Sequence, residues 1–271
     1  MKTIGIFDSG VGGLSVLRAL LTEIPEAHFV YVADSAFAPY GERSAQAVVN
    51  RSRRIAAHLR QHHAVDALVV ACNTATAMAV DELRRIYPHL PIVGVEPALK
   101  TAAALSRTGH IGVLATRGTL DSVRFAQLRS RVEDSAPRIH FSCQPCDGLA
   151  DAIERADPTT TQRLCERYLQ AVQALKDPTH RIDTLVLGCT HYPFAAPVLR
   201  QLCGSGVALV ETGLPVARRT RAVLGIDAAA VHRGPVAPFR LQLLSTGDPA
   251  ALTLAAQRWL CTSATAVRLV C

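Results

Sequence analysis

Two look-alike segments, one in each half of the chain, place the strongest constraint on its fold. Residues 65–74 read VDALVVACNT and residues 182–191 read IDTLVLGCTH. Each has an aspartate six residues before a cysteine, an apolar run between them, and a small residue directly before the cysteine. Short apolar runs of this kind are typical of fully buried strands in a parallel sheet. We therefore expect Cys72 and Cys189 at the carboxyl edge of a sheet, where open α/β sheets bind their ligands.

The rest of the chain alternates between candidate strands and segments with helical periodicity. Such alternation with short connections predicts parallel sheets joined by right-handed crossovers. The predicted fold class is α/β, with two similar α/β domains, mainly parallel sheets, and an active site in the cleft between the domains. The expected strands are 3–7, 28–33, 67–71, 92–95, 110–114, 138–142, 184–187, 208–210 and 241–245. The expected helices are 13–21, 45–62, 75–86, 119–132, 160–175, 193–202, 215–224 and 250–259.

The boundaries between the two domains follow from local breaks in this alternation. The chain is expected to pass from one half to the other near Pro97 and to return near Gly204–Gly206. The first domain, which carries the first cysteine, then comprises residues 1–97 and 208–271. The second domain comprises residues 98–207 and carries the second cysteine.

Size and composition exclude several classes of protein. A chain of 271 residues that is 49% hydrophobic and 19% charged can bury a large core in one or two domains. No apolar run reaches the roughly 18 residues that a membrane span needs, and the first residues run into a strand without the apolar region of a signal peptide. We therefore expect a cytoplasmic protein with no membrane partner. Its eight cysteines are then expected as reduced thiols rather than a disulfide framework.

The chain is basic, with 29 Lys and Arg against 22 Asp and Glu, a net charge of +7. The densest basic cluster is Arg51, Arg53 and Arg54 in an expected helix, where it spreads over more than one face and has no interleaved aromatic residues. This pattern favours a solvated helix surface over a nucleic-acid interface. We expect no nucleic-acid partner, although excess positive charge helps to attract an acidic small substrate.

The two thiols limit the chemistry that the chain performs. A nucleophilic cysteine needs one histidine base and leaves no role for a second cysteine, and a zinc site needs further ligands at short spacing, which neither segment has. Two opposed thiols suit inversion at a carbon centre, in which one removes a proton and the other delivers one to the opposite face. Both are expected where a strand turns into a helix, a setting that lowers the pKa of a thiol. The structural alternative is that each packs as a small hydrophobe.

Polar residues follow both cysteines. Asn73 and Thr74 carry donors that suit a carboxylate, or they cap a helix. His191, after Thr190, suits a hydrogen bond to the thiol that keeps its proton poised, or it is an exposed histidine at a helix cap. Pro193 suits the first turn of a helix.

Two loops in the first half carry further candidates. Residues 6–14 read IFDSGVGGL, a strand, a glycine-rich turn and a helix, without the lysine and spacing of a P-loop. There the glycines let the backbone approach a small anion, and Asp8 and Ser9 can bind an ammonium group or a carboxylate; turn chemistry is the alternative. Tyr40 and Gly41 belong to a Pro-Tyr-Gly turn whose backbone amides suit a pocket, or which only leads into a helix.

Cys143 and Cys146 form a Cys-x-x-Cys pair. The pair lacks the single βαβ setting of thioredoxin-like motifs, which disfavours a redox or zinc role. We therefore expect no metal and no cofactor.

These motifs together resemble the glutamate racemases of the cofactor-independent aspartate/glutamate racemase superfamily. The resemblance covers essentially the whole chain, and the order and spacing of its motifs are more specific than any one of them. It rests on residues 5–16, 33–34, 39–41, 71–75, 94–97, 115–119 and 187–193.

The resemblance implies interconversion of L- and D-glutamate, with D-glutamate supplied for peptidoglycan. It implies that Cys72 acts on the D-enantiomer and Cys189 on the L-enantiomer, assisted by Asp8 and His191. The residues that it implies for substrate binding are Asp8, Ser9, Tyr40, Gly41, Asn73, Thr74, Thr119, Thr190, His191 and Glu154.

The chain departs from the family pattern at two places. Asp147 replaces the proline of the usual Cys-Pro-Gly before Glu154, and Glu211 replaces a more usual aspartate. Three alternatives remain open: a racemase for aspartate or another small acid, a thiol or redox protein using the Cys-x-x-Cys pair, and a nucleic-acid-binding protein. A homodimer is also left open.

Overall fold

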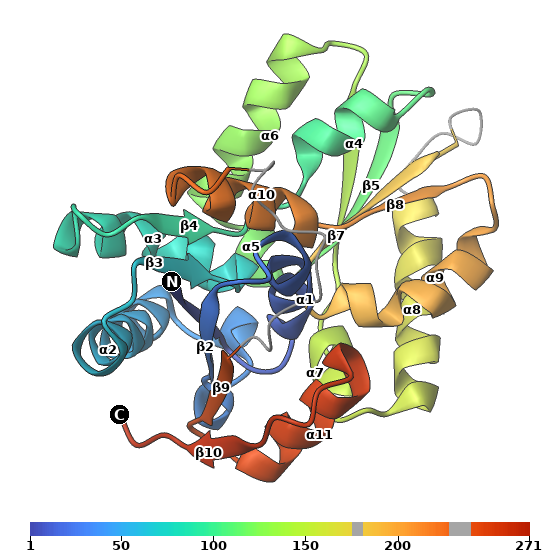
Figure 1. The fold of residues 1–271 in the computed structure, drawn as a ribbon. Coiled ribbons are helices and arrows are strands. Elements are labelled where there is room, and N and C mark those ends of the chain that lie inside the picture. Colours follow the sequence, from blue (N-terminus) through green and yellow to red (C-terminus); the bar gives the residue numbers. More distant parts are fainter. Residues whose placement is uncertain (175–180, 228–239) are drawn as a thin grey trace. The chain divides into compact units, whose positions relative to one another are not determined.

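A computed structural model describes residues 1–174, 181–227 and 240–271 (Figure 1). The chain forms two compact units, one made of Met1–Val95 and Gly213–Cys271 and the other of Glu96–Thr212. Each unit contains one β-sheet, and every strand pair in both sheets is parallel. The predicted α/β class with parallel sheets is confirmed.

The first unit has a six-stranded sheet in the order β10-β9-β2-β1-β3-β4. Its strands are β1 (Thr3–Asp8), β2 (His28–Ala33), β3 (Ala67–Val70), β4 (Ile92–Gly94), β9 (Arg240–Ser245) and β10 (Ala266–Arg268). Its α-helices are α1 (Leu14–Glu23), α2 (Ala45–His63), α3 (Asn73–Ile86), α10 (Gly213–Val223) and α11 (Pro249–Leu260), and its 3₁₀ turns are η1 (Ser35–Phe37) and η2 (Tyr40–Glu42).

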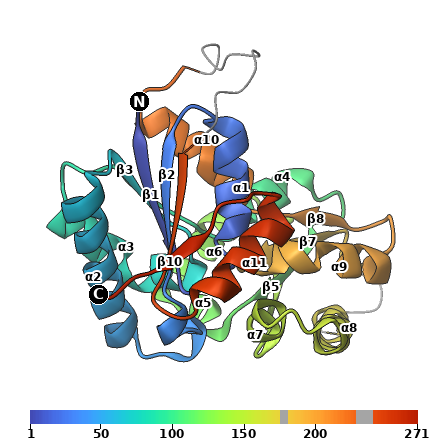
Figure 2. The same cartoon turned by 60° about the horizontal axis from the view of Figure 1, so that its bottom comes forward.

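Helices cover both faces of this sheet. Figure 2 shows α2 and α3 on one side and α1, α10 and α11 on the other. Because both faces are covered, the central strands are mainly apolar: Ile4, Ile6 and Phe7 of β1 are fully buried, and every residue of β3 is buried.

The second unit has a four-stranded sheet in the order β6-β5-β7-β8. Its strands are β5 (His110–Ala115), β6 (His140–Pro145), β7 (Thr184–Gly188) and β8 (Ala208–Val210). Its helices are α4 (Leu99–Leu105), α5 (Arg117–Leu120), α6 (Val123–Ser135), α7 (Leu149–Glu154), α8 (Pro158–Ala174) and α9 (Ala196–Cys203), with a 3₁₀ turn η3 (Tyr192–Ala195). Apolar residues of α4, α6, β5 and β7 share one buried cluster.

Several expected boundaries were wrong. The helix expected over 119–132 is two helices, because the hydroxyl of Ser122 accepts a hydrogen bond from Phe125 N at 3.1 Å and caps a new helix. The strand expected over 138–142 runs instead over His140–Pro145, in register with β5. Strand β10 and the short helices α4, α5 and α7 were not expected. Leu175, the expected end of α8, lies outside the described residues.

The aspartates of the two look-alike segments lie at the starts of their strands, opposite the cysteines. Asp66 accepts hydrogen bonds from Lys2 Nζ at 2.9 Å and Thr3 N at 2.8 Å. Asp183 accepts from the Ser106 hydroxyl at 2.6 Å, from the backbone N–H groups of Arg107 and Thr108, and from the hydroxyl of Thr184. Asp66 therefore ties the start of β1 to the start of β3, and Asp183 ties the loop 106–108 to the start of β7.

Within the parts of the chain that the structure describes, no helix combines the length and apolar character needed to cross a membrane.

Candidate functional site

Cys72 lies where β3 gives way to α3. It is the N-cap residue of that helix, with extended backbone angles, and its Sγ accepts a hydrogen bond from Ala75 N at 3.4 Å. The residue is 5% exposed. The positive end of a helix dipole and a backbone donor both favour the thiolate over the thiol. This is the strand-to-helix turn that the sequence predicts.

The ends of β1 and β3 bring Asp8 and Ser9 to the same sheet edge. The Ser9 hydroxyl lies 3.9 Å from the Sγ of Cys72. Asp8 Oδ1 accepts from Gly10 N at 2.8 Å and lies 3.4 Å from the Ser9 hydroxyl, and both residues are buried. A side chain at Gly13 would place its Cβ 2.7 Å from the Cβ of Asp8, so the glycine is required by this close approach.

Asn73 and Thr74 form the first turn of α3 and are buried. The Asn73 amide donates from Nδ2 to Val95 O at 3.2 Å, while its buried Oδ1 has no hydrogen-bond partner among the described residues. Buried polar atoms are nearly always paired, so this oxygen is an acceptor that a ligand donor can satisfy. We call Asp8, Ser9, Cys72, Asn73 and Thr74 the first thiol cluster.

In the Pro-Tyr-Gly turn, the tyrosine side chain points into the protein. Tyr40 is buried, and its hydroxyl donates to Asp34 Oδ2 at 2.5 Å. Burial, together with the charge and hydrogen bond of Asp34, raises the pKa of Tyr40 above its ordinary range. The hydroxyl is therefore engaged inside the protein, and only the backbone of Tyr40 and the half-buried Gly41 are left as candidate substrate donors.

Cys189 follows β7 directly and is 6% exposed. Its Sγ lies 3.8 Å from His191 Nδ1. A side chain at Gly188 would place its Cβ 2.9 Å from Leu114 O, which explains the small residue before the cysteine. The helix expected over 193–202 begins only at Ala196, after the 3₁₀ turn η3. Cys189 is therefore followed by a 3₁₀ turn, and not directly by the α-helix that the sequence predicts.

A histidine and a carboxylate support this second thiol. His191 Nε2 lies 2.5 Å from Glu154 Oε2, and the two side chains are 7% and 23% exposed. Burial lowers the pKa of His191, but the hydrogen bonds and charges of Cys189 and Glu154 outweigh burial and raise it well above its ordinary value. A cationic imidazole beside the sulfur favours the thiolate.

The substitution at Asp147 leaves Glu154 within reach of His191. Asp147 forms an exposed ion pair with Arg117 at 2.5 Å, and its carbonyl accepts from the Tyr168 hydroxyl at 2.6 Å. The chain then turns through Gly148, whose φ of 77° lies in the left-handed region, into helix α7. Glu154 is the last residue of α7.

Two threonines of this unit are candidate substrate-binding residues. Thr190 is buried, and in the sequence it lies between Cys189 and His191. Thr119 is also buried, but its hydroxyl lies 2.9 Å from that of Thr116, the N-cap residue of α5. We call Cys189, Thr190, His191 and Glu154 the second thiol cluster.

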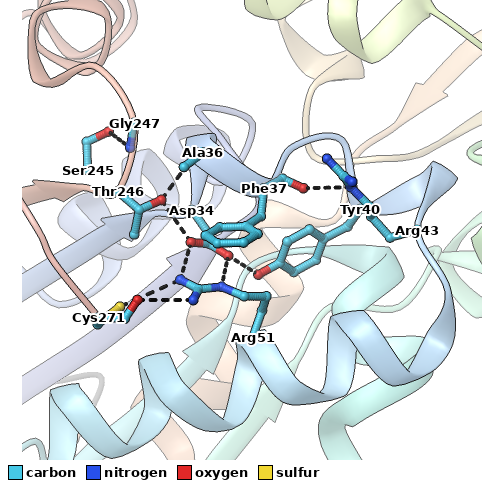
Figure 3. A network of polar contacts seen from close by, with 10 residues as sticks. All are labelled: Asp34, Ala36, Phe37, Tyr40, Arg43, Arg51, Ser245, Thr246, Gly247 and Cys271. Atoms are coloured by element: carbon cyan, nitrogen blue, oxygen red, sulfur yellow. Dashed lines mark hydrogen bonds and ion pairs between the residues drawn. The ribbon is translucent and has the colours of Figure 1, made fainter.

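Arg51 was expected on a solvated helix surface, and this expectation was wrong. The side chain is buried on the inner face of α2 and pairs with the fully buried Asp34 (Figure 3). A signal for this was present, because Arg51 lies three residues after Val48 and four before Ile55, on the apolar stripe of the helix.

The Cys-x-x-Cys pair has the properties of packing residues. All eight cysteines are free thiols. Burial raises the pKa of Cys143 to about 11, and burial also raises that of Cys146. In residues 1–174, 181–227 and 240–271, no group of three or more His, Cys, Asp or Glu side chains is arranged to hold a metal ion.

The fold and these contacts define a class of protein: a parallel α/β protein with a buried thiol at the carboxyl edge of each of two sheets. The family model described as Asp/Glu/Hydantoin racemase matches residues 4–220. The chain belongs to this family.

Similar proteins include the glutamate racemases of two pseudomonads. That of Pseudomonas paraeruginosa is 46% identical over 237 residues, covering 87% of this chain and 86% of the relative. That of Pseudomonas aeruginosa is 48% identical over 227 residues, covering 83% of this chain and 82% of the relative. Among solved structures, Escherichia coli glutamate racemase in complex with L-glutamate and the activator UDP-MurNAc-ala matches with a TM-score of 0.84 at 30% identity, covering 99% of this chain and 98% of that one.

Proposed function

We propose that this protein is a glutamate racemase that interconverts L- and D-glutamate without a cofactor. The observation that carries the proposal is the pair of buried thiols at matched strand ends, each with its own means of stabilising a thiolate. The names of relatives that are 46–48% identical support glutamate as the substrate.

The reaction moves one proton off and one proton onto the same carbon. Starting from L-glutamate, the Cys189 thiolate removes the α-proton and becomes a thiol, and the bond electrons remain on Cα. The Cys72 thiol then donates its proton to the opposite face and becomes a thiolate. The product is D-glutamate, and the protonation states of the two thiols are exchanged, which prepares the reverse reaction.

The α-proton of glutamate is very weakly acidic, so the site must stabilise the negative charge that develops at Cα. We propose that Thr74 and Thr190 donate to the α-carboxylate, and that Asp8 and the unpaired Oδ1 of Asn73 accept from the substrate ammonium. The Glu154–His191 pair keeps positive charge beside the Cys189 sulfur. General acid–base positioning contributes about 10²–10⁴-fold, and electrostatic stabilisation supplies the remainder.

We propose that the protein works in the cytoplasm and supplies D-glutamate for peptidoglycan. The closest rival within the family is a racemase for aspartate, whose side chain is one methylene shorter. Discrimination by one methylene is worth about 10–200-fold, so a substrate comparison separates the two.

The test is a racemisation assay by circular dichroism with both enantiomers of glutamate and of aspartate. The parent protein should racemise glutamate and act on aspartate at least about tenfold more slowly. Cys72→Ser and Cys189→Ser should each lose about 10³-fold or more of the activity. Cys261→Ser, which changes an exposed thiol, is the matched control and should retain it. A parent inactive on glutamate, or an active Cys72→Ser or Cys189→Ser variant, would refute the proposal.

A further inference from the structure

A buried carboxylate lies at the end of β2, one strand away from the first thiol cluster (Figure 3). Both oxygens of Asp34 are saturated with donors. Arg51 binds it in a bidentate manner, from Nε to Oδ2 at 3.0 Å and from Nη2 to Oδ1 at 2.8 Å. The hydroxyl of Tyr40 donates to Oδ2 at 2.5 Å and that of Thr246 to Oδ1 at 2.8 Å.

The guanidinium of Arg51 is equally well held. Its Nη1 donates to Cys271 O at 3.1 Å, its Nη2 lies 3.7 Å from the Cys271 Sγ, and its Cζ lies 3.8 Å above the centre of the Phe37 ring. Planar, bidentate pairs of this kind are among the stronger charged hydrogen bonds in proteins and fix the geometry of both partners. We call Asp34, Tyr40, Arg51, Thr246 and Cys271 the clamp.

The clamp fixes the loop that joins β2 to α2. Asp34 N donates to Asp8 O at 2.9 Å, so the first residue of the loop is tied to the first thiol cluster. Ala36 N donates to the Thr246 hydroxyl at 3.2 Å, and Thr246 N donates to Ala33 O at 3.0 Å. The loop is therefore held at its start by β1 and by the turn after β9, and in its middle by the Tyr40 hydroxyl.

Tyr40 connects the clamp to Cys72. The 3₁₀ turn η2, which begins at Tyr40, packs against α3, whose N-cap residue is Cys72. Tyr40 and Cys72 belong to the same buried cluster. After burial and Asp34, the charge of Cys72 is a further influence that raises the pKa of Tyr40.

We propose that Asp34 and Arg51 are positioning residues for the first thiol cluster, and that they act through Tyr40 to hold the turn 40–42 against the Cys72 end of α3. The inference rests on the proposed function, because it assigns these residues a role in the same site. It also assigns Thr246 and Cys271, far away in the sequence, to the support of that site. The ion pair keeps the charge near Cys72 balanced, because neither buried partner is left uncompensated.

The test compares the two thiols within one molecule. Iodoacetamide alkylation of Cys72 and Cys189 is followed by mass spectrometry at neutral pH, without glutamate. The variants are Asp34→Asn, Arg51→Met and Tyr40→Phe. The matched control is Glu23→Gln, which breaks another partly buried ion pair of the same unit, with Arg221, away from the loop.

The expected effects on Cys72 have opposite signs. Asp34→Asn leaves the cation of Arg51 uncompensated and should accelerate alkylation of Cys72 about tenfold, whereas Arg51→Met leaves the anion of Asp34 uncompensated and should slow it about tenfold. Tyr40→Phe keeps both charges and should change the rate by about threefold. Ser9 and the Ala75 N–H, which contact the Cys72 sulfur, are unchanged in every variant. Cys189 should stay within about twofold of the parent throughout, because no variant changes His191 or Glu154.

Two results would overturn the inference. One is a Cys72 rate that matches Glu23→Gln in all three variants. The other is a parallel change of both thiols, which indicates loss of structure instead of positioning. If the two charge variants fail to fold, Tyr40→Phe decides alone, because it removes only a hydroxyl. The assay needs no substrate, so it gives an answer even if the protein does not racemise glutamate.

Discussion

The two thiol clusters follow strands of similar sequence, β3 and β7, but their sulfurs have different neighbours. Cys72 is held by the backbone: it caps a 14-residue helix and accepts a hydrogen bond from Ala75 N. Cys189 has no α-helix directly behind it and lies instead beside His191, which pairs with Glu154. One thiol therefore depends on a fixed dipole that no pH change removes, and the other on an imidazole that can titrate.

The position of each sulfur and the stabilisation of its thiolate are therefore set by different residues. The apolar run and the small residue before each cysteine set where the sulfur lies, while the residues after it set how the thiolate is stabilised. The first cluster should respond little to pH beyond the titration of its own thiol. The second should carry the pH dependence of the enzyme.

The largest expected effect comes from the imidazole–carboxylate pair. Glu154→Gln removes one of the two groups that raise the pKa of His191 against the effect of burial, so the imidazole should lose its proton at lower pH. The basic limb of the pH profile of kcat/KM should move to lower pH, with kcat about 10²-fold lower. Glu166→Gln on α8 is the control and should match the parent. An unchanged pH profile in Glu154→Gln would contradict the claim that the second thiol cluster carries the pH dependence.

The next effect concerns the aspartates that begin the two segments. Burial raises the pKa of Asp183, but its hydrogen bonds, led by that of Ser106, lower it to about 2. Because the folded pKa is depressed, this stabilisation is present above pH 4 and is lost as the pH falls toward 2. At pH 7, Asp183→Asn should lower the free energy of unfolding by about 1–3 kcal/mol.

Asp66 is the matched position in the first unit and should matter less. Its pair with Lys2 is solvent-exposed, so Asp66→Asn should lower the free energy of unfolding by at most about 1 kcal/mol. Urea unfolding of both variants at pH 7 and near pH 2 checks the order. Equal effects of the two substitutions at pH 7 would contradict it.

The smallest effect separates the two cysteines by their role in helix capping. Serine is a good N-cap residue and alanine is not, so Cys72→Ala should be about 1 kcal/mol less stable than Cys72→Ser. Cys189 caps no helix of this kind, and Cys189→Ala and Cys189→Ser should show no such capping difference. Thermal unfolding of the four variants measures this, and an equal difference at both positions would remove the distinction between the clusters.

Local patterns predicted much of this molecule. The apolar runs predicted the parallel strands, and the contact suggested between His191 and the Cys189 thiol is present at 3.8 Å. Such features depend on a few consecutive residues and on the burial of both sheet faces. The glycine-rich turn after β1 could be expected for the same reason, since Gly13 is needed where the chain passes Asp8.

What the sequence missed depends on contacts between distant residues. Arg51 is buried because it meets Asp34, 17 residues before it, and Cys271, 220 residues after it. The short strand β10 exists because β9 offers it an edge. The late start of α9 reflects a competing 3₁₀ turn that holds Pro193, which periodicity does not distinguish from a first helical turn.

The central claim is that two different thiols serve the two faces of one carbon. The most direct test incubates the parent with a single glutamate enantiomer in deuterium oxide and analyses both enantiomers at early times, starting once from L- and once from D-glutamate. Two thiols predict that the product carries deuterium at Cα from the first turnovers while the remaining substrate keeps its hydrogen, in both directions. Product that retains the original hydrogen, or deuterium that enters substrate and product at the same rate, would mean that one base serves both faces and would contradict the account.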